Sequence, residues 1–178
     1  KYQIDVDDEI YKIIRKYHVP KINKTPFYFV STPMMALIAA KEEALKKNMI
    51  PIILSDKLEG EACIEGQKMG MLALKIKKNK KYKDILLDKP LLLLSGGETS
   101  VTIKGDGLGG RNTEFMLSMA KTLNGEDGIY GLSIDTDGID GIMDNAGSYI
   151  SPKTKHKAMK QDLNLDIFLQ NNDSYNFF

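Results

Sequence analysis

The stretch LLLLSGGETSVTIKGDGLGGRNTEF, residues 91–115, changes its pattern several times along its length. Residues 91–94 are an uninterrupted apolar run, which is typical of a strand covered on both faces. Residues 99–104 alternate between polar and apolar side chains, which predicts a strand with one covered face near a sheet edge. Four glycines follow within 105–110, and apolar positions then recur with helical spacing over 111–123. The stretch therefore predicts two strands, a glycine-rich loop and a helix.

The segment Ser95-Gly96-Gly97-Glu98 separates the two predicted strands. A pair of glycines between two strand-like runs is typical of a tight β-hairpin. We therefore expect residues 99–104 to pair antiparallel with residues 91–94. Parallel pairing would instead favour a dinucleotide-binding unit.

Helices and strands alternate along the rest of the chain. Apolar spacing predicts helices at 7–18, 33–47, 61–76 and 111–123, short helices in 152–178, and further strands at 27–30, 50–54 and 129–134. This alternation, with one hairpin, predicts an α/β fold: a layered domain with a mixed β-sheet flanked by helices. We expect an N-terminal helix and linker at residues 1–25 and the α/β domain at 26–178.

Composition excludes several classes of function. Lysine and arginine together number 25 and acids 24, so no overall charge attracts nucleic acid or a membrane surface. Cys63 is the one cysteine, which excludes an intramolecular disulfide and suits a reducing compartment. No apolar run approaches the roughly 20 residues that span a bilayer. We therefore expect a cytoplasmic protein, and the absence of an initiating methionine leads us to expect a fragment or processed product.

The glycine-rich loop and Arg111 form the first candidate site. Gly107, Gly109 and Gly110 allow the backbone to approach a ligand closely, and the helix N-terminus that follows favours an anion. Arg111 is one of two arginines beside 23 lysines, and its guanidinium suits bidentate contact with carboxylate or phosphate. The competing interpretation is a flexible strand-to-helix turn with a surface arginine.

The same loop also fits a dinucleotide-binding pattern through Gly105, Gly107 and Gly110. Asp135 ends the next predicted strand, where a ribose-binding acid would lie. Two features disfavour this interpretation: the preceding strand alternates, and a hairpin is wrong for a parallel βαβ unit.

Asp135, Asp137 and Asp140 place three carboxylates after one predicted strand. Carboxylate oxygens at a strand end could hold magnesium, which commonly bridges a carboxylate and a substrate phosphate. The alternative is an acidic turn held by hydrogen bonds from the backbone to aspartate side chains.

Several of these motifs, in this order, resemble the C-terminal half of the glycerate 2-kinase family, the half that carries the MOFRL domain. The resemblance runs from about residue 27 to the end and includes residues 54–62, 95–115, 135–141, 145–147 and 172–175. The family includes proteins once labelled hydroxypyruvate reductases.

The resemblance implies phosphorylation of the 2-hydroxyl of D-glycerate by ATP and Mg²⁺, in a cleft between this half and a larger Rossmann-like N-terminal domain that this chain lacks. Carried over to this sequence, Arg111 would be the catalytic arginine. Substrate or phosphate would contact Gly107, Gly109, Gly110, Asn112 and Glu98, and Asp135 and Asp137 would hold the metal.

The implied partners are ATP, D-glycerate and the missing domain, with a homo-oligomer left open. We expect the isolated chain to be inactive, and Arg111 to matter more to catalysis than to stability. Two alternatives remain: an NAD(P)-dependent oxidoreductase such as a hydroxypyruvate reductase, and a non-catalytic binding module.

Overall fold

The structure is a computed structural model that describes residues 7–16, 26 and 28–178. The chain divides into two compact units, residues 1–31 and 32–178. In the first unit, helix α1 (Asp8–Lys16) has acids in its first turn and bases in its last, which suits the helix dipole. The predicted helix at 7–18 is confirmed over these residues, while Tyr17 and His18 lie outside the described part. The predicted domain boundary at residues 25 and 26 stays a prediction.

The predicted strand at 27–30 is wrong for the residues that the structure describes. Tyr28, Phe29 and Val30 form no strand, and their exposed fractions are 85%, 76% and 90%. An apolar run becomes a strand only where a neighbouring backbone pairs with it, and none of the sheets among the described residues includes these three. Phe27 lies outside the described residues.

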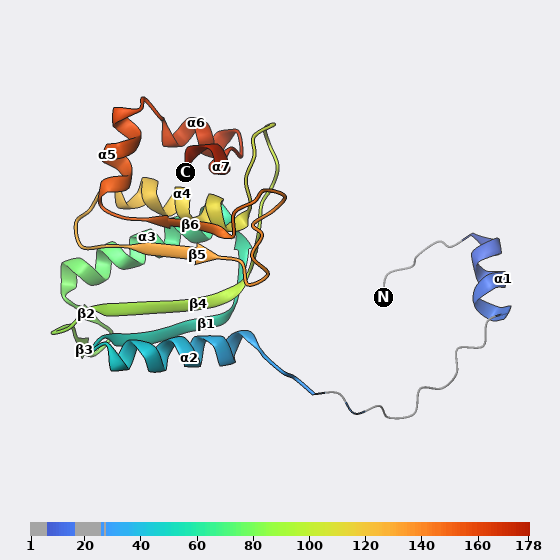
Figure 1. Ribbon diagram of the computed structural model, residues 1–178, viewed down its shortest axis with the longest axis horizontal. Coiled ribbons are helices and arrows are strands. Elements are labelled where there is room, and N and C mark those ends of the chain that lie inside the picture. Colours follow the sequence, from blue (N-terminus) through green and yellow to red (C-terminus); the bar gives the residue numbers. More distant parts are fainter. Residues whose placement is uncertain (1–6, 17–25, 27) are drawn as a thin grey trace. The chain divides into compact units, whose positions relative to one another are not determined.

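The second unit is a layered arrangement of helices and strands (Figure 1). Its elements are α2 (Pro33–Lys46), β1 (Ile50–Glu61), α3 (Ala62–Asn79), β2 (Lys81–Tyr82), β3 (Ile85–Leu86), β4 (Leu91–Ser100), α4 (Arg111–Leu123), β5 (Gly131–Ile134), β6 (Gly147–Ile150), α5 (Lys153–Lys160), α6 (Leu165–Gln170) and α7 (Ser174–Phe177). Thr32-Pro33 is a typical helix start, and the Thr32 side chain caps α2 by accepting a hydrogen bond from the Met35 amide at 3.2 Å. Asn48 follows α2 in the left-handed conformation, at φ 58°, which asparagine tolerates after a helix end.

Strands β1 and β4 are parallel neighbours, joined by α3. The predicted hairpin is therefore wrong: residues 91–100 form one strand, and residues 101–104 form none. Gly97 supplies the physical reason, because its φ is +145° and a Cβ there would lie 2.2 Å from the Leu58 amide nitrogen. The pairing of β1 with β4 is irregular between Ile53 and Leu58. The glycine lets that irregular part of β1 approach; it does not turn the chain.

The remaining strands pair antiparallel, β5 with β6 and β2 with β3. Helix α2 packs on β1 and β4, and α4 packs on β5 and β6. Strands flanked by helices confirm the predicted α/β class, and the parallel and antiparallel pairs are separate two-stranded sheets among the described residues. None of the helices in the described residues combines the length and the apolar character needed to cross a membrane.

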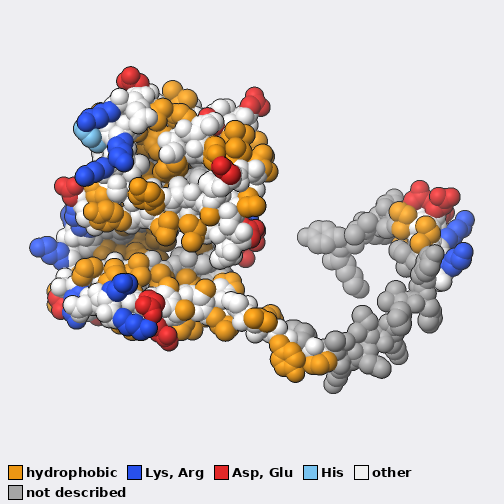
Figure 2. Space-filling model, viewed as in Figure 1, with side chains coloured by type: hydrophobic (Ala, Val, Ile, Leu, Met, Phe, Trp, Pro, Cys, Tyr) orange, Lys and Arg blue, Asp and Glu red, His pale blue; other side chains and the backbone are white. Residues whose placement is uncertain are grey.

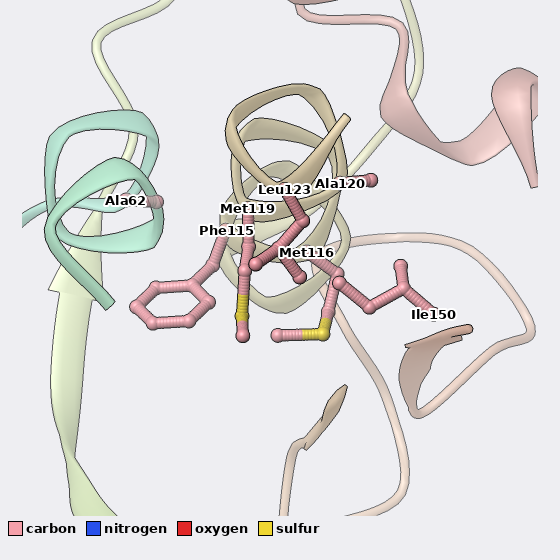
Figure 3. Packing of buried hydrophobic residues seen from close by; sticks show 7 residues of the cluster. All are labelled: Ala62, Phe115, Met116, Met119, Ala120, Leu123 and Ile150. Carbon is pink, nitrogen blue, oxygen red and sulfur yellow. The ribbon is translucent and has the colours of Figure 1, made fainter. Parts of the chain in front are cut away.

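The core is centred on the contact between α3 and α4. A Cβ at Gly66 would lie 2.2 Å from the Phe115 carbonyl oxygen, and one at Gly70 would lie 2.9 Å from Thr122 Cβ. The two helices can therefore approach closely because these positions lack side chains. The cluster beside this contact consists of Ala62, Phe115, Met116, Met119, Ala120, Leu123 and Ile150 (Figure 3). It includes Phe115, Met119, Ala120 and Leu123, the apolar positions of α4 whose helical spacing predicts an inward face.

The α3–α4 contact predicts the sign of one substitution. Alanine normally stabilises a helix interior over glycine by about 1 kcal/mol, but at Gly66 the new methyl group would collide with the Phe115 carbonyl. We therefore expect Gly66→Ala to lower the free energy of unfolding by roughly 1–3 kcal/mol, the usual cost of overpacking. Chemical denaturation of the purified chain measures this change. Lys75→Ala, at an exposed position of the same helix, is the control and should have little effect; a stabilised Gly66→Ala variant would contradict the packing described here.

Candidate functional site

A cleft of about 890 Å³ lies where the chain leaves β4 and enters α4. The charged residues that line it are Glu59, Glu98, Arg111, Glu114 and Asp137. Four of these five side chains are carboxylates, so the cleft has one cationic group among several acids. Gly107, Gly109 and Gly110 also line it, so the structure brings most of the residues predicted from the sequence to one place.

The N-terminus of α4 is occupied by the carboxylate of Asp140, which is 0% exposed. Its Oδ1 accepts hydrogen bonds from the Asn112 amide at 2.9 Å and from Asn112 Nδ2 at 3.1 Å. Its Oδ2 accepts from the Thr113 amide at 2.8 Å and lies 2.9 Å from the Thr113 hydroxyl. We expected an external anion at this helix end. The protein's own carboxylate occupies the free N–H groups of Asn112 and Thr113 instead.

Arg111, the first residue of α4, forms two ion pairs. Its Nη1 donates to Glu98 Oε1 at 2.7 Å, and its Nη2 donates to Asp135 Oδ2 at 2.5 Å. The side chain of Asp135 is 11% exposed, whereas that of Glu98 is 75% exposed. Partial desolvation lowers the pKa of Arg111, but Asp135, Glu98 and Asp140 outweigh it and raise that pKa above its ordinary value. Nη2 of the guanidinium is thus paired with a nearly buried carboxylate, and Nη1 is paired with an exposed carboxylate at the cleft.

This pairing changes one expectation from the sequence. Arg111 was expected to contribute little to stability, because its side chain was predicted to reach only solvent or the cleft. Removing it would leave the nearly buried Asp135 carboxylate with one long contact, from Asn112 Nδ2 at 3.5 Å. An uncompensated buried carboxylate is costly, so Arg111 also has a structural role.

Asn112 is held within the protein and does not line the cleft. Besides its bonds to Asp140, its Oδ1 accepts from the Ser133 hydroxyl at 2.5 Å. Both ends of the amide are therefore engaged by neighbouring side chains. This arrangement orients the start of α4 against β5.

The glycines of the loop are required by contacts within the protein. A Cβ at Gly107 would lie 2.4 Å from Asp173 Cβ, and one at Gly109 would lie 2.3 Å from the Ser174 hydroxyl oxygen. A Cβ at Gly110 would lie 2.4 Å from Asp140 Cγ. These close approaches explain the glycines without a ligand.

The C-terminal residues 171–174 hold the other side of the loop. The Gly107 amide donates to the Asn171 carbonyl at 2.9 Å, and the Leu108 amide donates to Asp173 Oδ1 at 2.8 Å. The sequence marks residues 172–175 as part of a motif but does not indicate their role. No local pattern could reveal that it packs on a loop more than sixty positions earlier in the chain.

The dinucleotide interpretation meets one of its requirements and fails the others. β1 and β4 are parallel, as a βαβ unit requires. However, the helix N-terminus where a pyrophosphate would bind is occupied by the Asp140 carboxylate. Asp135, the acid expected to bind a ribose, is paired with Arg111. The loop also packs along its length against residues 171–174.

The two acids predicted to hold a metal have different surroundings. Asp137 lines the cleft, and its Oδ1 accepts from the Ile139 amide at 2.9 Å. Asp135 instead turns toward Arg111. Among the described residues, the three side chains whose ligand atoms lie within 4.8 Å of one another are Glu61, Cys63 and Glu114.

Glu114 lines the cleft although no sequence motif indicated it as a site residue. It is 4% exposed and accepts from Asn172 Nδ2 at 3.0 Å. Burial is the largest cause of its raised pKa, with a smaller contribution from Glu61, while the Asn172 bond and Lys104 act against it. Its spacing from Arg111, three residues along the same helix, was a signal that could have found it, since such positions share a helix face.

Residues 91–178 match the MOFRL family model. The chain is 36% identical over 183 residues to a protein of Agrobacterium vitis provisionally named a hydroxypyruvate reductase, and 35% identical over 178 residues to a D-glycerate 2-kinase of Thermotoga maritima. Each match covers at least 99% of this chain and 41% of the relative. The chain is also 39% identical over 93 residues to human glycerate kinase, covering 50% of the chain and 18% of that protein.

Two solved structures resemble the chain. A crystal structure of glycerate kinase from Thermotoga maritima superposes with a TM-score of 0.80 at 32% identity, covering 98% of this chain and 41% of that one. A protein of Pyrococcus horikoshii superposes with a TM-score of 0.76 at 27% identity, covering 90% and 35%. The chain therefore spans about two fifths of the length of the relatives that match nearly all of it. Residues 91–178 thus match the MOFRL family model, and nearly all of the chain is similar to glycerate kinases, as the resemblance of its motifs predicted.

Proposed function

We propose that this chain is the C-terminal domain of an ATP-dependent glycerate 2-kinase, which transfers a phosphoryl group from ATP to the 2-hydroxyl of D-glycerate. The observation that carries the proposal is the position of Arg111. Its guanidinium lies at the cleft, anchored on one side by Asp135 and paired on the other with the exposed Glu98. An oriented guanidinium is suited to the negative charge on a phosphoryl group in transfer.

The excess of negative charge in the cleft indicates that cations from outside this chain are needed to bind anionic substrates. Two anionic substrates would meet four carboxylates and one guanidinium from this chain. Further cations are therefore required before the cleft can hold ATP and D-glycerate together. We infer that another domain and a bound divalent cation provide them.

The rim of the cleft supports the same inference. Four lining residues are large, apolar and exposed: Ile103 (80%), Leu108 (37%), Ile139 (53%) and Ile142 (85%). Exposed apolar residues gathered around a concave site are typical of a surface that another domain covers. The length of the relatives leaves room for such a domain.

Magnesium fits this cleft through Asp137 better than through Asp135. Asp137 is exposed at the cleft and uses one oxygen for a backbone contact, whereas one oxygen of Asp135 receives both Arg111 and Asn112. Magnesium commonly takes one or two protein carboxylates and completes its shell with phosphate oxygens and water. When bound, it would neutralise phosphate charge.

The residues of this chain would act by holding charge in place. Nη2 of Arg111 stays on Asp135 and fixes the plane of the guanidinium, while Nη1 exchanges Glu98 for a substrate carboxylate or phosphate oxygen. Gly107, Gly109 and Gly110 form the wall beside it. Asn112 acts indirectly, since its bonds to Asp140 fix the start of α4.

The isolated 178-residue chain should show no measurable glycerate kinase activity. Phosphoryl transfer requires both substrates to be positioned together, and this chain offers one side of the cleft. A coupled assay for ADP release with ATP, Mg²⁺ and D-glycerate tests this. The same assay on the full-length protein, meaning this chain joined to the remaining domain, is the positive control. Robust Mg²⁺-dependent turnover by the isolated chain would disprove the two-domain proposal, and oxidation of NADH or NADPH by full-length protein with hydroxypyruvate would favour the reductase.

In the full-length protein, Arg111→Ala should lower kcat by roughly a hundredfold or more, as the loss of a charge-stabilising donor does. It should also lower the free energy of unfolding by about 1–3 kcal/mol, because Asp135 loses its main partner. Arg111→Lys should recover part of the activity, since an ammonium group cannot bridge two acceptors in the same way.

The double variant Arg111→Ala with Asp135→Asn separates the two roles of the arginine. Removing the unpaired carboxylate should restore most of the stability and none of the activity. Steady-state kinetics and denaturant titrations measure the two effects. If stability and activity recovered together, Arg111 would be a structural residue only.

A further inference from the structure

The sheet of the second unit is interrupted between β4 and β5. β1 pairs with β4 and β5 pairs with β6, but within residues 32–178 no hydrogen-bonded ladder joins the two pairs. Figure 1 shows β4 and β5 running in the same direction, and β5 is the next strand beyond β4 across the second unit. Isolated two-stranded sheets are marginally stable, and parallel pairs normally lie inside larger sheets. The two strands therefore have unpaired edges that need an explanation.

Apolar side chains of α4 lie over this interval. In Figure 3, Phe115, Met116 and Met119 extend from α4 toward the level of the sheet, with β4 on one side and β5 and β6 on the other. β5 offers them no apolar side chain, because its positions that face α4 are Gly131, which lies against Met116, and Ser133, whose hydroxyl bonds to α4. The side chains of the helix thus point to a place where the described residues provide no strand.

On the face of the strands opposite α4, a helix of the described residues covers β1 and β4 but not β5 and β6. Helix α2 packs on β1 and β4, whereas Leu132, Ile134 and Tyr149 of β5 and β6 are 67%, 56% and 67% exposed. Figure 2 shows a hollow bordered by hydrophobic side chains between the part formed by α2, β1 and β4 and the part formed by β5 and β6. Apolar surface of this kind marks a place that another segment covers.

We propose that the position between β4 and β5 is filled by a β-strand from the part of the longer protein that lies outside these 178 residues. A strand is the element that satisfies the N–H and C=O groups of both edges at once. Its apolar side chains would meet Phe115 and Met119 on one face and continue the surface of Leu132 and Ile134 on the other. The result is one continuous sheet in the order β1, β4, added strand, β5, β6.

The source of the strand follows from the length of the relatives. This chain corresponds to 41% of the Thermotoga maritima D-glycerate 2-kinase, so a protein of that length has ample further polypeptide. A second copy of this chain is a poorer occupant, because a strand in this position must thread between two fixed edges and its own ends must leave on either side. The proposal concerns folding of the domain and does not depend on the kinase activity.

Amide hydrogen exchange, read residue by residue, tests the proposal. In the isolated chain, the β4 amides that point toward β1 should be protected from exchange. The β4 amides that point toward β5, and the β5 amides that point toward β4, should exchange rapidly. In the full-length protein these exposed amides should exchange at least about tenfold more slowly. The outward edges of β1 and β6 are the internal control, because they should change little.

Each other outcome overturns the proposal. Protection of the interval in the isolated chain at every concentration would mean that residues within the 178 fill it. Protection that rises with concentration would assign it to a second copy. Rapid exchange in a full-length protein that is otherwise protected would mean that no strand lies there. Equal slowing at the outward edges would indicate general stabilisation and no inserted strand.

Discussion

The buried carboxylate of Asp140 is the constraint on which the rest of this domain depends. It lies at the N-terminus of α4 and receives two backbone amides and two side chains of residues 112 and 113. A fully buried charge is tolerated only with such a complete set of donors. The same carboxylate excludes a side chain at Gly110. It therefore fixes the loop from which Arg111 projects, and Thr113 extends the network to the Ser174 hydroxyl at 2.9 Å.

The cleft is built from segments that come together only in the folded chain. The end of β4 contributes Glu98, the start of α4 contributes Arg111, and the turn after β5 contributes Asp137. Residues 171–174 close the glycine-rich loop from behind. Because these segments meet at the cleft, its lining presents one guanidinium among acidic and apolar side chains. Similarity to the glycerate kinases gives this cleft a chemical context, and its excess of carboxylates is the basis for proposing that a second domain completes it.

Local features of the fold were predictable from sequence, and pairings across the chain were not. The cap at Thr32, the inward face of α4 and the mixed α/β class follow from residue type and spacing. The hairpin failed because Gly96-Gly97 has a local signature of a turn, while the irregular part of β1 that Gly97 admits lies about forty positions earlier. The anion expected at α4 was present but internal, since Asp140 is 28 positions from Asn112. The cleft glycines were identified correctly as unusual, yet Gly107 and Gly109 are required by contact with the C-terminal segment and Gly110 by contact with Asp140.

The Arg111–Glu98 pair has a consequence for how the cleft would respond to salt. An anion arriving at a bare arginine gains a new charge contact, and that gain weakens steeply as ionic strength rises. Here a tethered anion already occupies the exposed side of the guanidinium, so a dissolved anion must replace it. The site then behaves as an ion exchanger: charge contacts are swapped and their number is unchanged. Anion binding at this guanidinium should therefore be weaker and less sensitive to salt than binding at an unpaired arginine, and it should depend more on the shape and bidentate geometry of the incoming group.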